Sequence, residues 1–306
     1  MFKKQRQEAG DNSQQIQAGI VIINSGIDEM RGRDIVNEKI DNELINNINK
    51  LYERVCQVFD EHNVPLQQIP KFIDSVFDVK YSDLQSKTDF IKKLNPQLID
   101  WICETFSVNK DWIENRCDFI YKTIDVYKYP ESFRNLILKI IKDNDIVINY
   151  QDNIDVYIFK EDVEYKGDDT GEESYVQFII RVKIKSVNDT SIYKYYVIRN
   201  NLYWNYWKCR RDSKIIIAIC KGLAINVHGF TLEHDILERL GAGCEFPEKL
   251  ISKCYRYTWY PEDYVDNFKL DANEKNDYAL NGINLKEIVF ETREIIKNLK
   301  EDYYKK

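Results

Sequence analysis

A ten-residue segment rich in aromatic and basic side chains, residues 203 to 212, is the part of the chain best suited to bind a ligand. It reads Tyr-Trp-Asn-Tyr-Trp-Lys-Cys-Arg-Arg-Asp. Aromatic rings can stack on a base, and arginines beside them can neutralise a phosphate. The residues that we expect to bind a ligand here are Trp204, Tyr206, Trp207, Arg210 and Arg211.

Two interpretations of this segment follow from its spacing. If it is a strand, alternation places Trp204 and Tyr206 on one face, with Tyr203, Trp207 and Cys209 on the other. A nucleotide-processing pocket could then form near Trp204, Trp207 and Arg210. Alternatively, the rings pack beneath a helix that starts near Ser213, and both arginines lie in solvent.

Other groups of reactive side chains do not form a recognised catalytic or metal-binding pattern. His228, His234, Cys244 and Cys254 are separated by five, nine and nine residues, which matches no zinc-finger or zinc-ribbon spacing. No nucleophile elbow, Walker loop or dinucleotide fingerprint is present in the sequence. The sequence therefore predicts no catalytic residue, no metal site and no cofactor.

Composition and charge narrow the class of protein. The 306 residues are 43% hydrophobic and 31% charged, with a net charge of -7, which is typical of a globular chain with two or three domains. A general nucleic-acid coat protein would carry a basic excess. The sequence has no long apolar run for a membrane span and no signal-peptide core at its start. Seven scattered cysteines without close pairs favour a cytoplasmic protein.

Four regions are expected to position these groups. Residues 1–26 are an N-terminal arm in which a β-branched run, residues 14–24, predicts a strand. That strand could pair with its own domain or with the same segment of another chain. Residues 27–143 are expected to be an all-α domain, residues 144–260 an antiparallel α+β sensor or interaction domain, and residues 261–306 a helical tail.

The helical region carries clear start signals. An apolar stripe predicts a first helix that ends near Glu61, and its members are Leu44, Ile48, Leu51, Val55, Val58 and Phe59. Further helices are expected to begin at Pro70, near Ser82, after Asn95, after Asn109 and at Pro130. We expect the stripe to pack in the core.

The region after residue 143 is rich in β-branched and aromatic residues, which favour strands. Strands are expected at residues 146–149, 155–159, 175–185, 192–199 and 203–209, with a hairpin turn at residues 187–191. Helices are expected at residues 213–223, after Thr231 as far as Gly241, and at residues 284–303. The fold class is therefore α+β and multidomain, with a mainly antiparallel sheet.

Residues 65 to 115 resemble the XRE-type, lambda-repressor-like family of helix-turn-helix domains. The closing pattern of that family is met by Ile102-Cys103, Phe106, Val108 and Trp112-Ile113. Upstream, Ile73, Val79 and Leu84 match the apolar positions that hold the two DNA-reading helices together. The resemblance implies a short turn that sets the second helix at a fixed angle for the major groove.

Three positions depart from the family in its DNA-reading half. Pro70 stands where the family has a glutamine that contacts DNA, Asp74 replaces a small alanine, and Asp78 replaces the turn glycine. Proline has no N–H group to donate a hydrogen bond to DNA, and exposed carboxylates repel the phosphates. The residues that we expect to contact DNA or a protein partner are Lys80, Ser82, Gln85, Lys87, Lys92 and Lys93.

These observations predict a non-catalytic regulatory protein that contacts DNA or a protein partner through its helical domain. The α+β domain would receive a small ligand or a second protein. The tract that starts at Gly10-Asp-Asn-Ser is similar to short tracts in bacterial phage-defence proteins, which suggests a role in bacterial antiviral defence. The alternatives are an oligomeric scaffold without DNA binding and a nucleotide-processing enzyme that uses residues 203–211.

Overall fold

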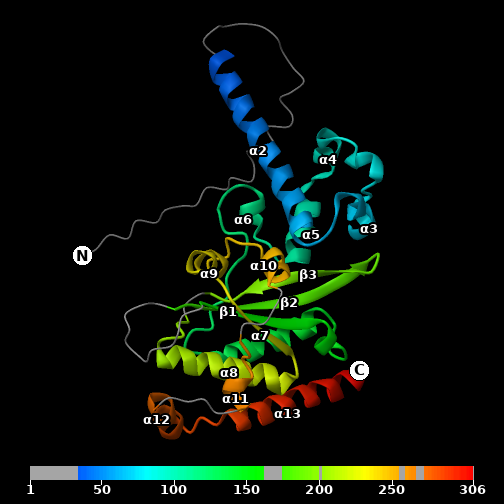
Figure 1. The fold of residues 1–306 in the computed structure, drawn as a ribbon. Helices are drawn as coiled ribbons and strands as arrows, with labels where there is room; N and C mark the ends of the chain where they lie inside the picture. Colours follow the sequence, from blue (N-terminus) through cyan, green and yellow to red (C-terminus); the bar gives the residue numbers. More distant parts are fainter. Residues whose placement is uncertain (1–33, 162–173, 200–201, 255–258, 267–271, 306) are drawn as a thin grey trace, which may run out of the picture. The chain divides into compact units, whose positions relative to one another are not determined.

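The computed structural model describes residues 34–161, 174–199, 202–254, 259–266 and 272–305 (Figure 1). The chain divides into two units, residues 1–46 and residues 47–306. The described part of the first unit is the beginning of helix α2 (Asp34–Glu61), which continues into the second unit. The arm strand predicted at residues 14–24, with its proposed role in self-association, lies outside the described residues.

A four-stranded mixed sheet forms the centre of the second unit. Its strands are β1 (Ile154–Lys160), β2 (Val176–Val187), β3 (Thr190–Val197) and β4 (Asn226–Thr231). Their order is β3-β2-β1-β4. Strands β1, β2 and β3 are antiparallel neighbours, whereas β4 is parallel to β1. A parallel neighbour needs a crossover connection, and helix α8 (Trp207–Leu223) lies within it.

The predicted α+β class is confirmed, and two of the predicted strands are wrong. Residues 146–149 form turns before the 3-10 turn η5 (Tyr150–Asp152). Within residues 203–209, only Tyr203 makes a strand-like bridge, to Tyr175, before α8 begins. The predicted hairpin turn is confirmed, because Asn188 and Asp189 both have positive φ, at 47° and 64°. Such a pair matches the twist of the strands that it connects.

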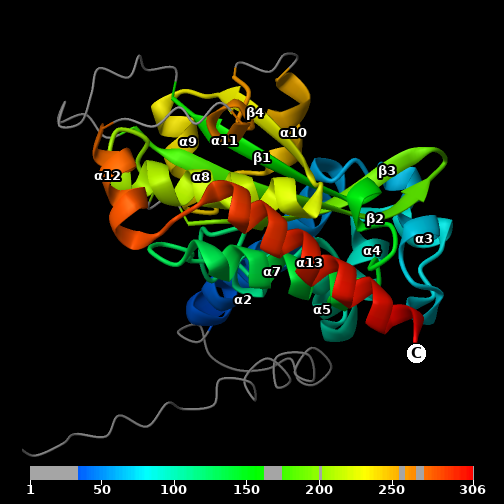
Figure 2. The same ribbon diagram turned by 90° about the horizontal axis from the view of Figure 1, so that it is seen from below.

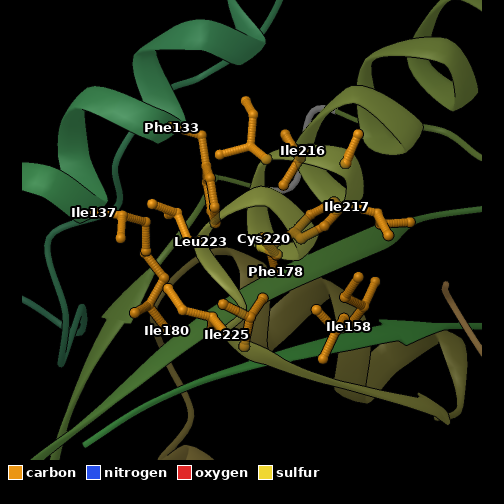
Figure 3. Close-up of a cluster of buried hydrophobic side chains, with 14 of the residues drawn as sticks. Phe133, Ile137, Ile158, Phe178, Ile180, Ile216, Ile217, Cys220, Leu223 and Ile225 are labelled. Carbon is orange, nitrogen blue, oxygen red and sulfur yellow. The ribbon is translucent and has the colours of Figure 1, made fainter. Parts of the chain in front are cut away.

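Helices α7 (Pro130–Asp143), α8 and α13 (Leu285–Tyr304) cover one face of the sheet (Figures 1 and 2). Figure 3 shows the core between α7, α8 and the sheet, where Ile137 of α7 lies near Leu223 of α8 and Ile180 of β2. The ring of Phe133 meets that of Phe178 edge-on, with centroids 6.2 Å apart. Helix α8 carries apolar residues around most of its circumference, as a helix packed on several sides requires.

A glycine allows α13 to approach α8 closely. A Cβ on Gly222 would lie 2.6 Å from Cβ of Thr292 and 2.8 Å from the carbonyl oxygen of Val289. Helix propensity alone favours alanine over glycine by about 1 kcal/mol. However, the two near atoms are the Cβ of Thr292 and the backbone oxygen of Val289. Neither atom moves when a side chain changes rotamer, so the contact can be relieved only by a shift of the helix.

We therefore expect Gly222→Ala to lower the free energy of unfolding by about 1–2 kcal/mol, because α13 must move away from α8. Equilibrium unfolding in urea measures this change. A variant that is more stable than the parent chain would contradict the close approach of the two helices.

The helical region covers the opposite face of the sheet. After α2 it contains six short elements: η2 (Leu66–Gln68), α3 (Ile69–Phe72), η3 (Ser75–Phe77), η4 (Tyr81–Leu84), α4 (Lys87–Lys93) and α5 (Pro96–Phe106). Helices α6 (Lys110–Ile113), α9 (His234–Gly241) and α10 (Pro247–Lys253) complete this layer. Its buried side chains join Tyr157, Phe159 and Tyr195 of the sheet in one cluster, so the helical and α+β regions share a core.

The residues predicted to begin helices are mostly confirmed, whereas several predicted helices are shorter in the structure than expected. Asn95 and Asn109 cap α5 and α6 as predicted, each accepting a backbone N–H through its side chain. The helix predicted from Pro70 ends at Phe72, and the one predicted from Ser82 divides into η4 and α4. In α2, Val55, Val58 and Phe59 are buried, whereas Leu44 and Ile48 are exposed, which corrects their assignment to the core.

The remaining elements are α11 (Asp263–Asp266) and α12 (Ala272–Asn281), which contact α8. Helix α13 follows α12 and corresponds to the amphipathic helix predicted at residues 284–303. None of the described helices has the length and apolar character needed to cross a membrane.

Candidate functional site

The lysines predicted to contact DNA lie beside carboxylates. Ammonium-to-carboxylate distances are 3.0 Å for Lys80 with Asp78, 3.3 Å for Lys87 with Glu53, 3.0 Å for Lys92 with Asp89 and 3.3 Å for Lys93 with Asp83. Ser82 and Gln85 are exposed on the turn before α4. The structure thus brings the predicted residues to one stretch of surface, but it neutralises each of the four cations.

The three positions that depart from the helix-turn-helix family have identifiable structural roles. Pro70 lies in the first turn of α3, where its missing N–H leaves no helical hydrogen bond unmade. The Asp74 carboxylate accepts from the backbone N–H of Val76 at 3.1 Å. Asp78 occupies the place of the family's turn glycine and has a left-handed backbone, with φ of 46°. Asp78 therefore has the left-handed backbone that glycine adopts most readily.

Apolar side chains are exposed on the same turns. Val76 on η3 is 77% exposed, Tyr81 on η4 is 55% exposed and Leu66 on η2 is 47% exposed. The turns η2 and η4 contact each other. We call Leu66, Val76 and Tyr81 the Tyr81 surface. Exposed apolar groups gathered among paired charges are typical of a protein contact and not of a phosphate contact.

The predicted ligand site at residues 204–211 is divided between core and surface. Trp204 is 6% exposed and packs against Trp259, with ring centroids 5.6 Å apart. Arg210 is 3% exposed and donates to the Trp204 carbonyl. Burial leaves neither residue a surface on which a base could stack. The strand alternation predicted for these rings is wrong, because α8 begins at Trp207.

The other members of that set remain accessible in part. Tyr206 is exposed and Trp207 is half-buried. The Arg211 guanidinium donates to Asp212, with Nη2 2.6 Å from Oδ1, and both residues line a cavity of about 460 Å³. The same cavity is lined by Glu131, Glu287 and Glu291. This acidic lining makes the cavity a poor place for a phosphate.

The histidines and cysteines considered for zinc are dispersed. His228 lies on β4 with Nε2 3.2 Å from Oδ1 of Asp155, and His234 lies on α9 with Nδ1 2.8 Å from Oε1 of Glu161. Cys244 and Cys254 are free thiols. Within the described ranges, no group of three His, Cys, Asp or Glu side chains could hold a metal ion.

A charged cluster on the sheet was missed by the sequence analysis. Arg181 on β2 donates to Asp155 on β1, with Nη2 2.7 Å from Oδ2, and lies over the rings of Tyr157 and Tyr193. Burial acts to raise the pKa of Asp155, but hydrogen bonds from His228 and Arg181 hold it below its ordinary value. Only the strand register brings these residues together, so no local pattern could have revealed them.

A second polar network joins the helical region to the sheet. His62 at the end of α2 is buried, and its Nδ1 lies 2.6 Å from the Val58 carbonyl oxygen. Nδ1 therefore carries the proton, and Nε2 accepts from the Tyr121 hydroxyl at 3.3 Å. Burial lowers the pKa of His62 to about 4, although the hydrogen bond to Val58 opposes this shift.

Glu248 of α10 completes the connection. It accepts from the Tyr195 hydroxyl of β3 and from the amide of Asn63 at 2.8 Å. Burial raises the pKa of Glu248, and Arg181 opposes that shift. These buried groups hold helix, strand and α10 in register, which is a structural role.

No protein-family model matches the chain, and no curated protein or solved structure matches it. The assignment of function therefore depends on the geometry described above.

Proposed function

We propose that this chain is a non-catalytic regulatory protein that binds a protein partner through the Tyr81 surface of its helical region. The observation that carries the proposal is the combination of paired lysines with apolar side chains that are exposed on the successive turns η2, η3 and η4. Each of the four lysines predicted to contact DNA or a partner has a carboxylate within 3.3 Å, while Leu66, Val76 and Tyr81 are exposed.

The electrostatics disfavour DNA as the partner. Binding to a duplex gains most of its affinity when lysines and arginines replace counterions along the phosphates. Here Asp78, Asp83 and Asp89 lie beside the lysines and would approach the phosphates with them. A protein surface imposes no such repulsion, and aromatic anchors such as Tyr81 are enriched in protein interfaces.

The likeness to a helix-turn-helix domain supports the same function. The resemblance depends on the sequence pattern of residues 65–115, since in the structure the helix predicted from Pro70 ends at Phe72 and the next one divides into η4 and α4. Such a domain with altered surface chemistry would serve as a recognition module for protein. The cytoplasm is the compartment that we propose, since all seven cysteines are free thiols. The antiviral setting depends on the N-terminal tract alone and stays a proposal.

Site-specific photo-crosslinking tests the partner assignment. A benzophenone amino acid at position 81 of the full chain, expressed in the organism that encodes it, should yield one discrete protein adduct. The same amino acid in place of Phe290 on α13 should not yield that adduct, although Phe290 is 64% exposed. Position 290 is the matched control because it is an exposed aromatic on the opposite face of the sheet.

A titration of duplex DNA by fluorescence anisotropy supplies the second arm of this test. We expect no binding that weakens between low and moderate salt. Salt-dependent binding that is lost in Lys80→Glu with Lys87→Glu would contradict the proposal and restore DNA as the partner.

A further inference from the structure

Three cations lie in a row on α13, on the face of the sheet opposite the Tyr81 surface. Arg293, Lys297 and Lys300 are spaced by four and three residues, so they share one side of the helix. From the first to the last, the helix rises by about 10 Å. All three line a cavity of about 340 Å³ between α13 and the end of α8.

These cations have no carboxylate partner among the residues that the structure describes. No ion pair joins Arg293, Lys297 or Lys300 to an acidic group, although Glu301 lines the same cavity. By contrast, Lys80, Lys87, Lys92 and Lys93 each lie beside a carboxylate. Like charges at this spacing repel one another on a helix, and a bound anion would remove that repulsion.

The end of α8 does not account for the row of cations. Cations can stabilise a helix C-terminus by compensating its exposed carbonyls. Here the Leu223 carbonyl accepts from the Tyr150 hydroxyl at 2.7 Å, and the carbonyls of Cys220 and Lys221 accept from backbone N–H groups. The last turn is thus satisfied by other donors, which leaves the charges available to a ligand.

The cavity also has an apolar and aromatic wall. Tyr150, Leu223 and Ile296 are buried beside it, and Tyr304 is 72% exposed at its rim. The Lys300 ammonium lies 4.9 Å from the centre of the Tyr150 ring. The volume of the cavity falls in the range of small-molecule binding sites. A ligand that fills this space needs a flat, partly apolar body together with an anionic group.

We propose that this cavity binds a nucleoside phosphate, with the phosphates on Arg293 and Lys297 and the base against the apolar wall. Guanidinium and ammonium groups form charge-assisted hydrogen bonds with phosphate oxygens, and an exposed tyrosine ring offers a stacking surface for a base. This site is independent of the Tyr81 surface, so either proposal can fail without the other.

Isothermal titration calorimetry of the full chain with ADP, GDP, CDP and UDP tests the site. We expect at least one to bind, with adenosine (or the matching nucleoside) and inorganic phosphate each binding at least tenfold more weakly. The double variant Arg293→Glu with Lys297→Glu should weaken binding about 100-fold, since two charge-assisted contacts are reversed. Both side chains are exposed, so the fold should persist, and circular dichroism checks this.

The matched control is Lys253→Glu with Lys275→Glu, which makes the same change in net charge at exposed positions on α10 and α12. It should leave the affinity unchanged. The proposal is overturned if none of the four diphosphates binds more tightly than ~1 mM. Equal loss of binding in the control, or equal affinity for inorganic phosphate, would also overturn it, because either result shows unspecific attraction of anions.

Discussion

Replacing Phe106 by alanine should lower the free energy of unfolding by about 4 kcal/mol, the cost expected for deleting a fully buried phenylalanine. Phe106 is fully buried at the end of α5, where its ring stacks on Phe72 at 5.3 Å between centroids and meets Phe59 edge-on at 5.6 Å. The ring also lies 4.4 Å from His62. Its removal leaves a cavity at the junction of the helical region and the sheet.

Equilibrium unfolding in urea, combined with hydrogen exchange, measures the effect. Because the helical region and the sheet share one buried cluster, amides of α5 and of β3 should lose protection together. Phe119→Ala is the control, since Phe119 is half-exposed and the same truncation should cost less than about 0.5 kcal/mol. Loss of protection confined to α5 would show that the two regions unfold independently.

The second large effect is a dependence of stability on pH through His62. Its pKa is about 4 in the folded chain and 6.5 when unperturbed. Between these values the unfolded chain binds a proton that the folded chain does not, so stability rises with pH and falls as the pH is lowered. One pKa unit corresponds to about 1.4 kcal/mol. We therefore expect a loss of about 2 kcal/mol from pH 7 to pH 5, and about 3 kcal/mol by pH 4.

His62→Phe isolates this contribution, because phenylalanine has a similar shape and no proton to gain. Glu248 acts in the opposite direction: its raised pKa adds stability that is lost as the pH rises above 4.5, its ordinary value. The difference between the parent chain and His62→Phe removes that common effect. A difference that is constant between pH 7 and pH 5 would mean that His62 binds its proton equally in the folded and unfolded chains, so that burial does not lower its pKa.

Local signals in the sequence predicted local structure well. The asparagine caps at Asn95 and Asn109 and the turn at Asn188-Asp189 depend on a few neighbouring residues, and all three are present. The alternating aromatics at residues 203–209 predict a strand, and this prediction is wrong because α8 begins at Trp207. Alternation describes a strand only when a neighbouring strand pairs with it.

Features that depend on contacts between residues far apart in the sequence could not be predicted from local patterns. Strand β4 is a short segment containing Gly229 and His228, and its parallel pairing with β1 makes it a strand. The pairing of Arg181 with Asp155 needs the register of β1 and β2. The sequence of α13 predicts an amphipathic helix, but the cavity beside its cations depends on the approach of α13 to α8 at Gly222.

The measurement that tests the proposed function most directly is the crosslinking contrast between positions 81 and 290 in the organism that encodes the protein. We predict a discrete protein adduct from position 81, where the apolar Tyr81 surface is open, and its absence from position 290. The adduct should persist at high salt, because an apolar contact is not screened. Absence of an adduct at position 81, or the same adduct from both positions, would contradict a partner site on the helical region.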